Sequence, residues 1–125
     1  MFEGRHLIDG ELTLGEGGTA GQWIESHEPA TLKPLGRVPV ATAADVDRAV
    51  QTAARAQRDW VGLSVWERAA RLRSLAAAIR ARGAEILSLE ARDTGNTIGK
   101  LRADVEIAAG YLEYFAGLGS ELKGE

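Results

Sequence analysis

The stretch Leu89-Glu90-Ala91-Arg92-Asp93-Thr94-Gly95-Asn96, followed by Tyr111-Leu112-Glu113-Tyr114-Phe115-Ala116-Gly117, decides how the second half of this chain folds. The first piece closes an apolar-periodic segment, because glycine readily takes the left-handed conformation that ends a helix. Asp93 stands near that helix end, so a cap explains the turn structurally and a functional explanation stays open beside it. The second piece ends a longer helical segment, residues 99–119.

The segment 99–119 predicts a helix with two adjacent apolar stripes. The first stripe is Leu101, Val105, Ala108, Leu112 and Phe115, and the second is Ile107, Tyr111, Tyr114 and Leu118. A helix that is apolar over so wide an arc needs cover on more than one side. The preceding helices can cover one stripe, so the other predicts contact with a further domain or subunit.

Three further helices are predicted from Thr42 onward, in a region without proline. Thr42 is a suitable N-cap with Asp45 three residues later, and Ser64 with Glu67 forms a capping box for the second helix. The third runs over 84–92. The expected apolar faces of the first two are Val46, Ala49, Val50, Ala53 and Trp60, then Val65, Ala69, Leu72, Ala76 and Ile79.

Short strands and turns are predicted for residues 1–41, before the helices of 42–121, in one domain of 125 residues and of the α/β class. The pair Asp9-Gly10 between apolar residues indicates a hairpin. Residues 23–27 predict a strand. Residues 36–38, between Pro34 and Pro39, predict a short edge strand.

The composition excludes several classes of function. The net charge is −3, which gives no footprint for nucleic acid or an anionic membrane surface. No apolar run is long enough to cross a bilayer, and no signal region is present, so a cytoplasmic location is expected. The chain contains no cysteine, which excludes disulfides, thiolate zinc sites and a cysteine nucleophile within these residues.

The glycine-rich stretch Gly15-Glu16-Gly17-Gly18-Thr19-Ala20 fits the pattern G-x-G-x-x-A of dinucleotide-binding turns. That pattern binds a pyrophosphate only where it opens a helix. Gly21 follows and a proline comes soon after, so nothing here predicts a helix. A surface loop over residues 13–21 is therefore favoured over a phosphate site.

The remaining polar residues favour ordinary surfaces over sites. Five arginines between positions 68 and 82 span more than one helical face and are interspersed with glutamates, which favours a salt-bridged surface over an anion-binding stripe. His6 and His27 have no neighbours at the spacing of zinc ligands. No serine stands in the context of a nucleophile elbow.

Along nearly its whole length the chain resembles the N-terminal segment of NAD(P)-dependent aldehyde dehydrogenases. The motifs that carry this resemblance are Leu7-Ile8-Asp9-Gly10, Glu28-Pro29-Ala30-Thr31, Asp45-Val46-Asp47-Arg48-Ala49-Val50, Ser64 to Leu75, and the two stretches quoted first. Within the family, the betaine-aldehyde-type branch is the most similar. The resemblance implies an α/β fold with a Rossmann-type NAD(P) domain, which this segment precedes.

The resemblance also implies the chemistry of an oxidoreductase that converts an aldehyde to a carboxylic acid. The family's cysteine nucleophile, general base and nucleotide-contacting motifs correspond to positions beyond Glu125. No catalytic and no cofactor-binding residue is therefore predicted in this chain, and NAD or NADP belongs to the complete enzyme. The implied partners are the rest of an aldehyde dehydrogenase chain or a homo-oligomer, and a small aldehyde substrate.

Two sites carry over from the family by residue position. A monovalent cation site, for K⁺ or Na⁺, would use main-chain oxygens of Ser26 and His27 and the carboxylate of Asp93, since hard cations take oxygen ligands. Ala103 and Ile107, one helical turn apart, match residues that line the aldehyde entry tunnel. Glu28 replaces the family's usual Asn, and Asn96 its usual Lys.

Three interpretations follow from these observations. The first is a catalytically incomplete N-terminal segment of an aldehyde dehydrogenase. The second is a non-enzymatic helical interaction module that docks through the two-striped helix. The third is a non-functional truncated fragment.

Overall fold

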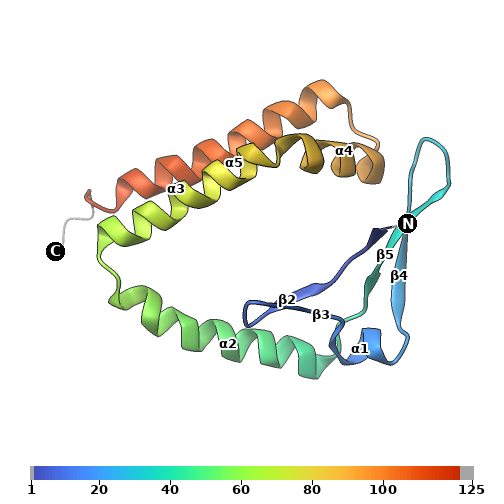
Figure 1. Ribbon diagram of the computed structural model, residues 1–125, viewed down its shortest axis with the longest axis horizontal. Helices are drawn as coiled ribbons and strands as arrows, with labels where there is room; N and C mark the ends of the chain where they lie inside the picture. The colour runs from blue at the N-terminus through green and yellow to red at the C-terminus, as the bar shows by residue number, and fades with distance from the viewer. Residues whose placement is uncertain (1, 122–125) are drawn as a thin grey trace. The chain divides into compact units, whose positions relative to one another are not determined.

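Residues 2–121 are described by a computed structural model, in two compact units that divide between Asp59 and Trp60. The first unit contains β1 (Phe2–Glu3), β2 (His6–Ile8), β3 (Glu11–Thr13), α1 (Gly15–Thr19), β4 (Trp23–His27), β5 (Pro34–Pro39) and most of α2 (Ala43–Gly62). The second unit contains α3 (Val65–Ala81), α4 (Gly83–Thr94) and α5 (Ile98–Leu118) (Figure 1). Short strands thus precede long helices, as the sequence predicts.

The strand β5 is the centre of a three-stranded sheet of order β1-β5-β4. It pairs in parallel with β1 and antiparallel with β4. The prediction that residues 36–38 form an edge strand was therefore wrong. The strand tolerates this position because Pro34 and Pro39, which lack an amide hydrogen, stand only at its two ends.

The hairpin of β2 and β3 confirms the prediction made from Asp9-Gly10. The two strands are antiparallel, with Ile8 opposite Glu11. The turn residues Asp9 and Gly10 have φ of 58° and 76°, and a type I′ turn requires such positive values at both positions.

The glycine-rich stretch is a short helix, α1, and the predicted surface loop over residues 13–21 was wrong. Gly15, Gly17 and Gly18 are buried. A Cβ atom on Gly17 would overlap the carbonyl oxygen of Val40, and one on Gly18 would lie 2.6 Å from the Pro39 side chain. The glycines are therefore required for close backbone packing against the end of β5, which outweighs their poor helix propensity.

The helix α2 begins after Thr42, as predicted, but its buried face is not the predicted one. Val46 and Val50 are 53% and 62% exposed, whereas Asp45 and Thr52 are buried and Ala49 is half-buried. The β2–β3 hairpin lies against α2 on the side of Ala49 and Thr52, around a small cavity. Val46 and Val50 do not line this cavity.

The helices of the second unit start and stop where the sequence predicts. The capping box of Ser64 and Glu67 starts α3, and Gly95, with φ of 72°, ends α4. The helices α3 and α5 run side by side in Figure 1. They are antiparallel, since Val65 lies against Gly119 and Arg80 against Glu106.

The packed faces of α3 and α5 are lined by small residues. On α3, Ala69 and Ala76 are fully buried, within the predicted stripe. On α5 the buried residues are Leu101, Ala109 and Ala116, whereas Ala108 and Phe115, which share the first apolar stripe with Leu101, are exposed. Alanines on both helices allow the backbones to approach, and the larger Phe115 ring is left 60% exposed.

Candidate functional site

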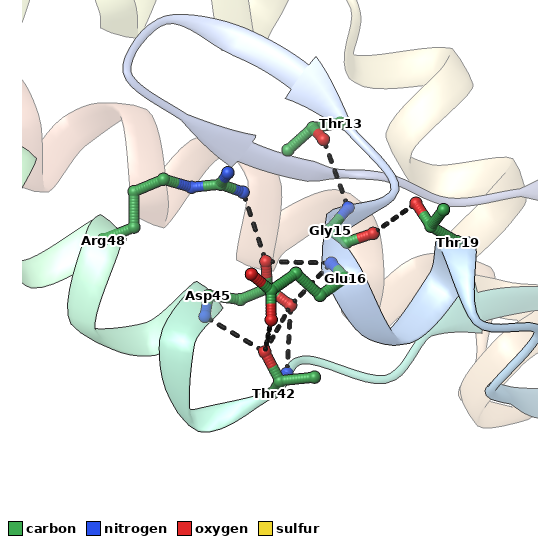
Figure 2. A network of polar contacts seen from close by, with 7 residues as sticks. All are labelled: Thr13, Gly15, Glu16, Thr19, Thr42, Asp45 and Arg48. Atoms are coloured by element: carbon green, nitrogen blue, oxygen red, sulfur yellow. Dashed lines mark hydrogen bonds and ion pairs between the residues drawn. The ribbon is translucent and has the colours of Figure 1, made fainter.

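The most densely bonded polar group in the first unit is the carboxylate of Asp45, which is 2% exposed (Figure 2). Its two oxygens accept hydrogen bonds from the backbone amide of Glu16 at 3.1 and 3.0 Å. One oxygen also accepts from the amide and the hydroxyl of Thr42, both at 3.0 Å. Arg48 donates to the other oxygen at 3.2 Å. Asp45 thereby joins the N-termini of α1 and α2.

This environment stabilises the ionised form of Asp45. The amide of Thr42 contributes most and the amide of Glu16 and the hydroxyl of Thr42 add to it, against the opposing effect of burial, so that the pKa of Asp45 falls from 3.8 to about 2. A carboxylate with so low a pKa and with its oxygens occupied by donors is a poor general base at neutral pH. The geometry makes Asp45 a structural anion.

Because of this carboxylate, the glycine-rich stretch is not suited to bind NAD or NADP. A pyrophosphate would need the free amides at the start of a helix. At the start of α1 the amide of Glu16 donates to Asp45, and the amide of Gly15 donates to the hydroxyl of Thr13 at 3.1 Å. The residues around α1 do not fit the phosphates of a dinucleotide, so no cofactor chemistry is assigned to them.

Ser26 and His27, two predicted cation ligands, are the last residues of β4 in the first unit. The pairing of β4 with β5 is irregular between them, and Pro34 is the register partner of His27. Proline has no amide hydrogen, so it donates no ladder hydrogen bond to the carbonyl of His27. A main-chain oxygen at such an irregularity is chemically suited to a hard cation.

Asp93, the third predicted cation ligand, lies in the last turn of α4 in the second unit. Among residues 2–121 no cluster of three or more His, Cys, Asp or Glu side chains could hold a metal ion. That finding does not test the predicted site, which uses two main-chain oxygens and a single carboxylate. The cation site stays a prediction.

Ala103 and Ile107, the predicted tunnel residues, both lie on α5 with exposed side chains. They begin a line of exposed side chains on one face of the helix, at spacings of three and four residues. We call this line, with its neighbouring ring, the exposed α5 face: Ala103, Ile107, Tyr111, Tyr114 and Phe115. Tyr114 and Phe115 meet edge to face, with ring centroids 5.3 Å apart. The second apolar stripe read from the sequence contains Ile107, Tyr111 and Tyr114 of this face, and the first contains Phe115.

Arg80 of α3 and Arg82, which follows this helix, form ion pairs of the kind that the sequence predicts, whereas Arg68 donates to the carbonyl of Leu63. Arg80 donates to Glu106 at 3.0 Å and to both oxygens of Glu113 on α5, which raises the pKa of Arg80 and lowers that of Glu113. Arg82 pairs with Glu85. Glutamates therefore occupy the guanidinium groups of Arg80 and Arg82, so these two arginines do not form an anion site.

Sequence reasoning missed two features that only the fold assembles. The first is the buried junction around Asp45. The N-cap pattern predicts the contact of Asp45 with Thr42, but nothing in the sequence indicates the contact with Glu16, 29 residues earlier. The second is a cavity of about 290 Å³ between α3, α4 and α5.

Within residues 2–121, no helix has the length and apolar character needed to cross a membrane.

Solved structures similar to this chain include aldehyde dehydrogenases. Lactaldehyde dehydrogenase from Escherichia coli matches 98% of this chain with 32% identity and a TM-score of 0.92. PnpE, solved in complex with nicotinamide adenine dinucleotide, matches 99% with 33% identity and a TM-score of 0.90. An NAD-dependent aldehyde dehydrogenase from Sinorhizobium meliloti matches 99% with 28% identity and a TM-score of 0.90.

The chain spans 25% of the length of each of these three proteins. Its short strands and following helices reproduce the N-terminal part of their α/β fold, which confirms the predicted fold class. The sequence profile of the aldehyde dehydrogenase family matches residues 16–125. On these grounds the chain belongs to the aldehyde dehydrogenase family.

Proposed function

We propose that this chain is the N-terminal segment of an NAD(P)-dependent aldehyde dehydrogenase that oxidises a small aldehyde to a carboxylic acid. The observation that carries the proposal is the match of nearly the whole chain to one quarter of several aldehyde dehydrogenases. The chain contains no cysteine, so the nucleophile would come from residues outside these 125. The nearer resemblance to betaine-aldehyde-type enzymes, a homo-oligomeric state and a cytoplasmic location belong to the same proposal.

Within that enzyme this chain would contribute helix packing and part of the lining of the aldehyde entry. The Asp45 junction fixes the start of α2 relative to α1, and the Arg80 ion pairs hold α3 against α5. Ala103 and Ile107 would line the aldehyde entry, presenting a small and a branched apolar side chain. An apolar lining suits the hydrocarbon part of an aldehyde and excludes water from the path.

We further propose the K⁺ or Na⁺ site formed by the main-chain oxygens of Ser26 and His27 with the carboxylate of Asp93. Support comes from the irregular strand end at His27, opposite a proline, and from the chemistry of the donor set. A cation there would stabilise the folded chain by linkage. The test is the unfolding midpoint in KCl, NaCl and choline chloride at equal ionic strength, with Asp93→Asn as the variant that removes the effect.

A second candidate function is a non-enzymatic interaction module. The observation that favours it is the exposed α5 face, where Ile107, Tyr111, Tyr114 and Phe115 are each more than half exposed. Large aromatic side chains exposed together mark surfaces that other proteins cover. In the enzyme proposal Ala103 and Ile107 border the aldehyde entry, and the remaining part of the enzyme covers the three aromatic side chains. In the module proposal another chain does so.

A chimaera separates the two functions. This chain would replace the matched N-terminal quarter of the Escherichia coli lactaldehyde dehydrogenase, and NADH formation would be followed with lactaldehyde. We expect activity from the chimaera and none from the 125-residue chain alone. A chimaera that folds, by circular dichroism, and yet lacks activity contradicts the enzyme proposal.

The tunnel residues are tested in the same chimaera. Ile107→Trp should narrow the entry and raise KM several-fold, because the ring would project from the proposed tunnel wall. Arg102→Trp adds the same bulk on another face of α5 and serves as the matched control. Equal effects of the two substitutions would contradict the assignment of Ile107 to the tunnel.

A further inference from the structure

The second unit contains a cavity that its own side chains leave unfilled. Its apolar wall is formed by Ile79 of α3, Ile86 and Leu87 of α4, and Leu101 and Val105 of α5. Its volume is about 290 Å³. Protein interiors are ordinarily close-packed, with few voids larger than a water molecule. A cavity of this size, near the roughly 300 Å³ at which small-molecule pockets begin, is large enough for a small organic ligand.

The cavity is negatively charged at its polar edge. Glu90 of α4 and Asp104 of α5 are the two ionisable residues in its lining. Asp104 pairs with Lys100 at 2.6 Å, one turn back on the same helix. Within residues 2–121 the side chain of Glu90 forms no ion pair. The charges of Glu90, Asp104 and Lys100 sum to −1, so one net negative charge lies beside the apolar wall of the cavity.

The adjoining cavity shows that the charge is local. It shares Leu87 and Val105 with the first, but its ionisable lining residues are Arg80, Arg102 and Glu106. Leu87 and Val105 therefore separate two cavities. The ionisable groups of the first are carboxylates, and those of the second are mainly guanidinium groups. A cationic ligand would be attracted to the first cavity rather than to the second, where Glu106 and Glu113 already neutralise Arg80.

We propose that the cavity between α3, α4 and α5 binds a short primary alkylammonium ion. The hydrocarbon chain would lie against Ile79, Ile86 and Leu101, where it is removed from water. The ammonium group would lie between Glu90 and Asp104, each of which can accept a hydrogen bond from it. Such a site is independent of dehydrogenase chemistry and uses only residues of the second unit.

Hexylammonium chloride is a suitable probe, with hexan-1-ol as its uncharged match. Binding to the complete 125-residue chain would be followed by amide chemical shifts in ¹H–¹⁵N spectra. We expect hexylammonium to shift the amides of residues 86–90 and 101–108 and to bind at least several-fold more tightly than hexanol. Glu90→Gln and Asp104→Asn should each weaken hexylammonium binding on the order of threefold, the size expected of a partly exposed ion pair. Asp59→Asn removes the same charge from the first unit and should leave the affinity unchanged.

Two further variants act in opposite directions. Lys100→Gln frees Asp104 from its partner and should tighten hexylammonium binding on the order of twofold to threefold. Lys33→Gln removes the same charge from the first unit and is its control. Ala108→Phe places a ring in the cavity from its rim and should abolish binding of both probes, with the fold checked by circular dichroism.

Three results would overturn the proposal. The first is equal affinity for hexylammonium and hexanol, which would mean that the carboxylates take no part. The second is a shift pattern outside the cavity, and the third is unchanged binding in Ala108→Phe that retains its fold. A gain of affinity in Lys100→Gln cannot come from mere damage to the fold, so this variant keeps the test independent of stability.

Discussion

The carboxylate of Asp45 accepts two hydrogen bonds from the backbone amide of Glu16, a residue 29 positions earlier in the chain. The same carboxylate caps α2 through the amide and hydroxyl of Thr42. One side chain therefore satisfies backbone donors at the start of two helices, which would otherwise lack partners. This relationship explains why an aspartate is buried in a segment with few other buried side chains.

Replacement of Asp45 by Asn should lower the thermal unfolding midpoint of the chain by several degrees. The amide side chain retains one acceptor oxygen but brings two hydrogens toward donors, so the amides of Glu16 and Thr42 compete for one partner. Asp47→Asn, an exposed position half a turn further along α2, is the control and should have little effect. Equal midpoints for the two variants, measured by circular dichroism, would contradict the junction.

The contribution of Asp45 should depend on pH below about 4. Its pKa is about 2 in the folded chain and 3.8 in the unfolded reference, so the unfolded state binds the proton first as the pH falls. The stabilisation is fully present above 3.8 and is lost as the pH decreases toward 2. The difference in urea midpoint between wild type and Asp45→Asn should therefore shrink between pH 4.5 and pH 2. A constant difference across this range would refute the assigned pKa.

Gly15→Ala should destabilise the first unit more than Gly21→Ala. Both glycines have positive φ, 66° and 80°, so both substitutions carry the left-handed backbone cost of about 1 kcal/mol. A Cβ on Gly15 would also lie 2.7 Å from the Asp45 carboxylate, whereas nothing lies within 4 Å of one on Gly21. The free energies of unfolding from urea titrations give the comparison. A larger loss at Gly21 would contradict the packing of α1.

Removal of the Ser64 hydroxyl should destabilise the second unit by about 1 kcal/mol, the ordinary cost of losing an N-cap. In the structure, that hydroxyl accepts from the amide of Glu67 at 3.2 Å, and the Glu67 carboxylate accepts from the amide of Ser64 at 2.8 Å. Ser74→Ala, an exposed position inside α3, is the matched control and should be neutral or slightly stabilising. Equal effects of the two substitutions would mean that the capping box does not form in solution.

Which face of α5 is buried can be tested by enlarging one side chain and truncating another. Ala109→Leu should cost about 1–3 kcal/mol, because Ala109 is fully buried in the second unit. Phe115→Ala should cost less than about 1 kcal/mol, because its ring is 60% exposed. If Phe115 were buried together with Leu101 of the same apolar stripe, its truncation would cost about 3–5 kcal/mol. Chemical unfolding of the two variants distinguishes these outcomes.

The positions of helix ends followed from local chemistry. Thr42 with Asp45, Ser64 with Glu67, and the left-handed Gly95 are all local signals, which act within a few residues and hardly depend on the rest of the fold. The Asp9-Gly10 hairpin belongs to the same class. The family resemblance, too, was carried by such local stretches and is confirmed by the match over residues 16–125.

Which surface each element buries was decided only by tertiary structure. Val46 and Phe115 are as apolar as core residues but lie outside the packed faces, and Asp45 is polar but buried. Glycines are required in α1 because Pro39 and Val40 approach Gly18 and Gly17, and the Asp45 carboxylate approaches Gly15, too closely for a side chain. Apolar periodicity gives the width of a helix face but not the size of the partner that meets it. Hydrogen-bond partners as distant as Glu16 and Asp45 leave no pattern in the sequence, because only the folded chain brings them together.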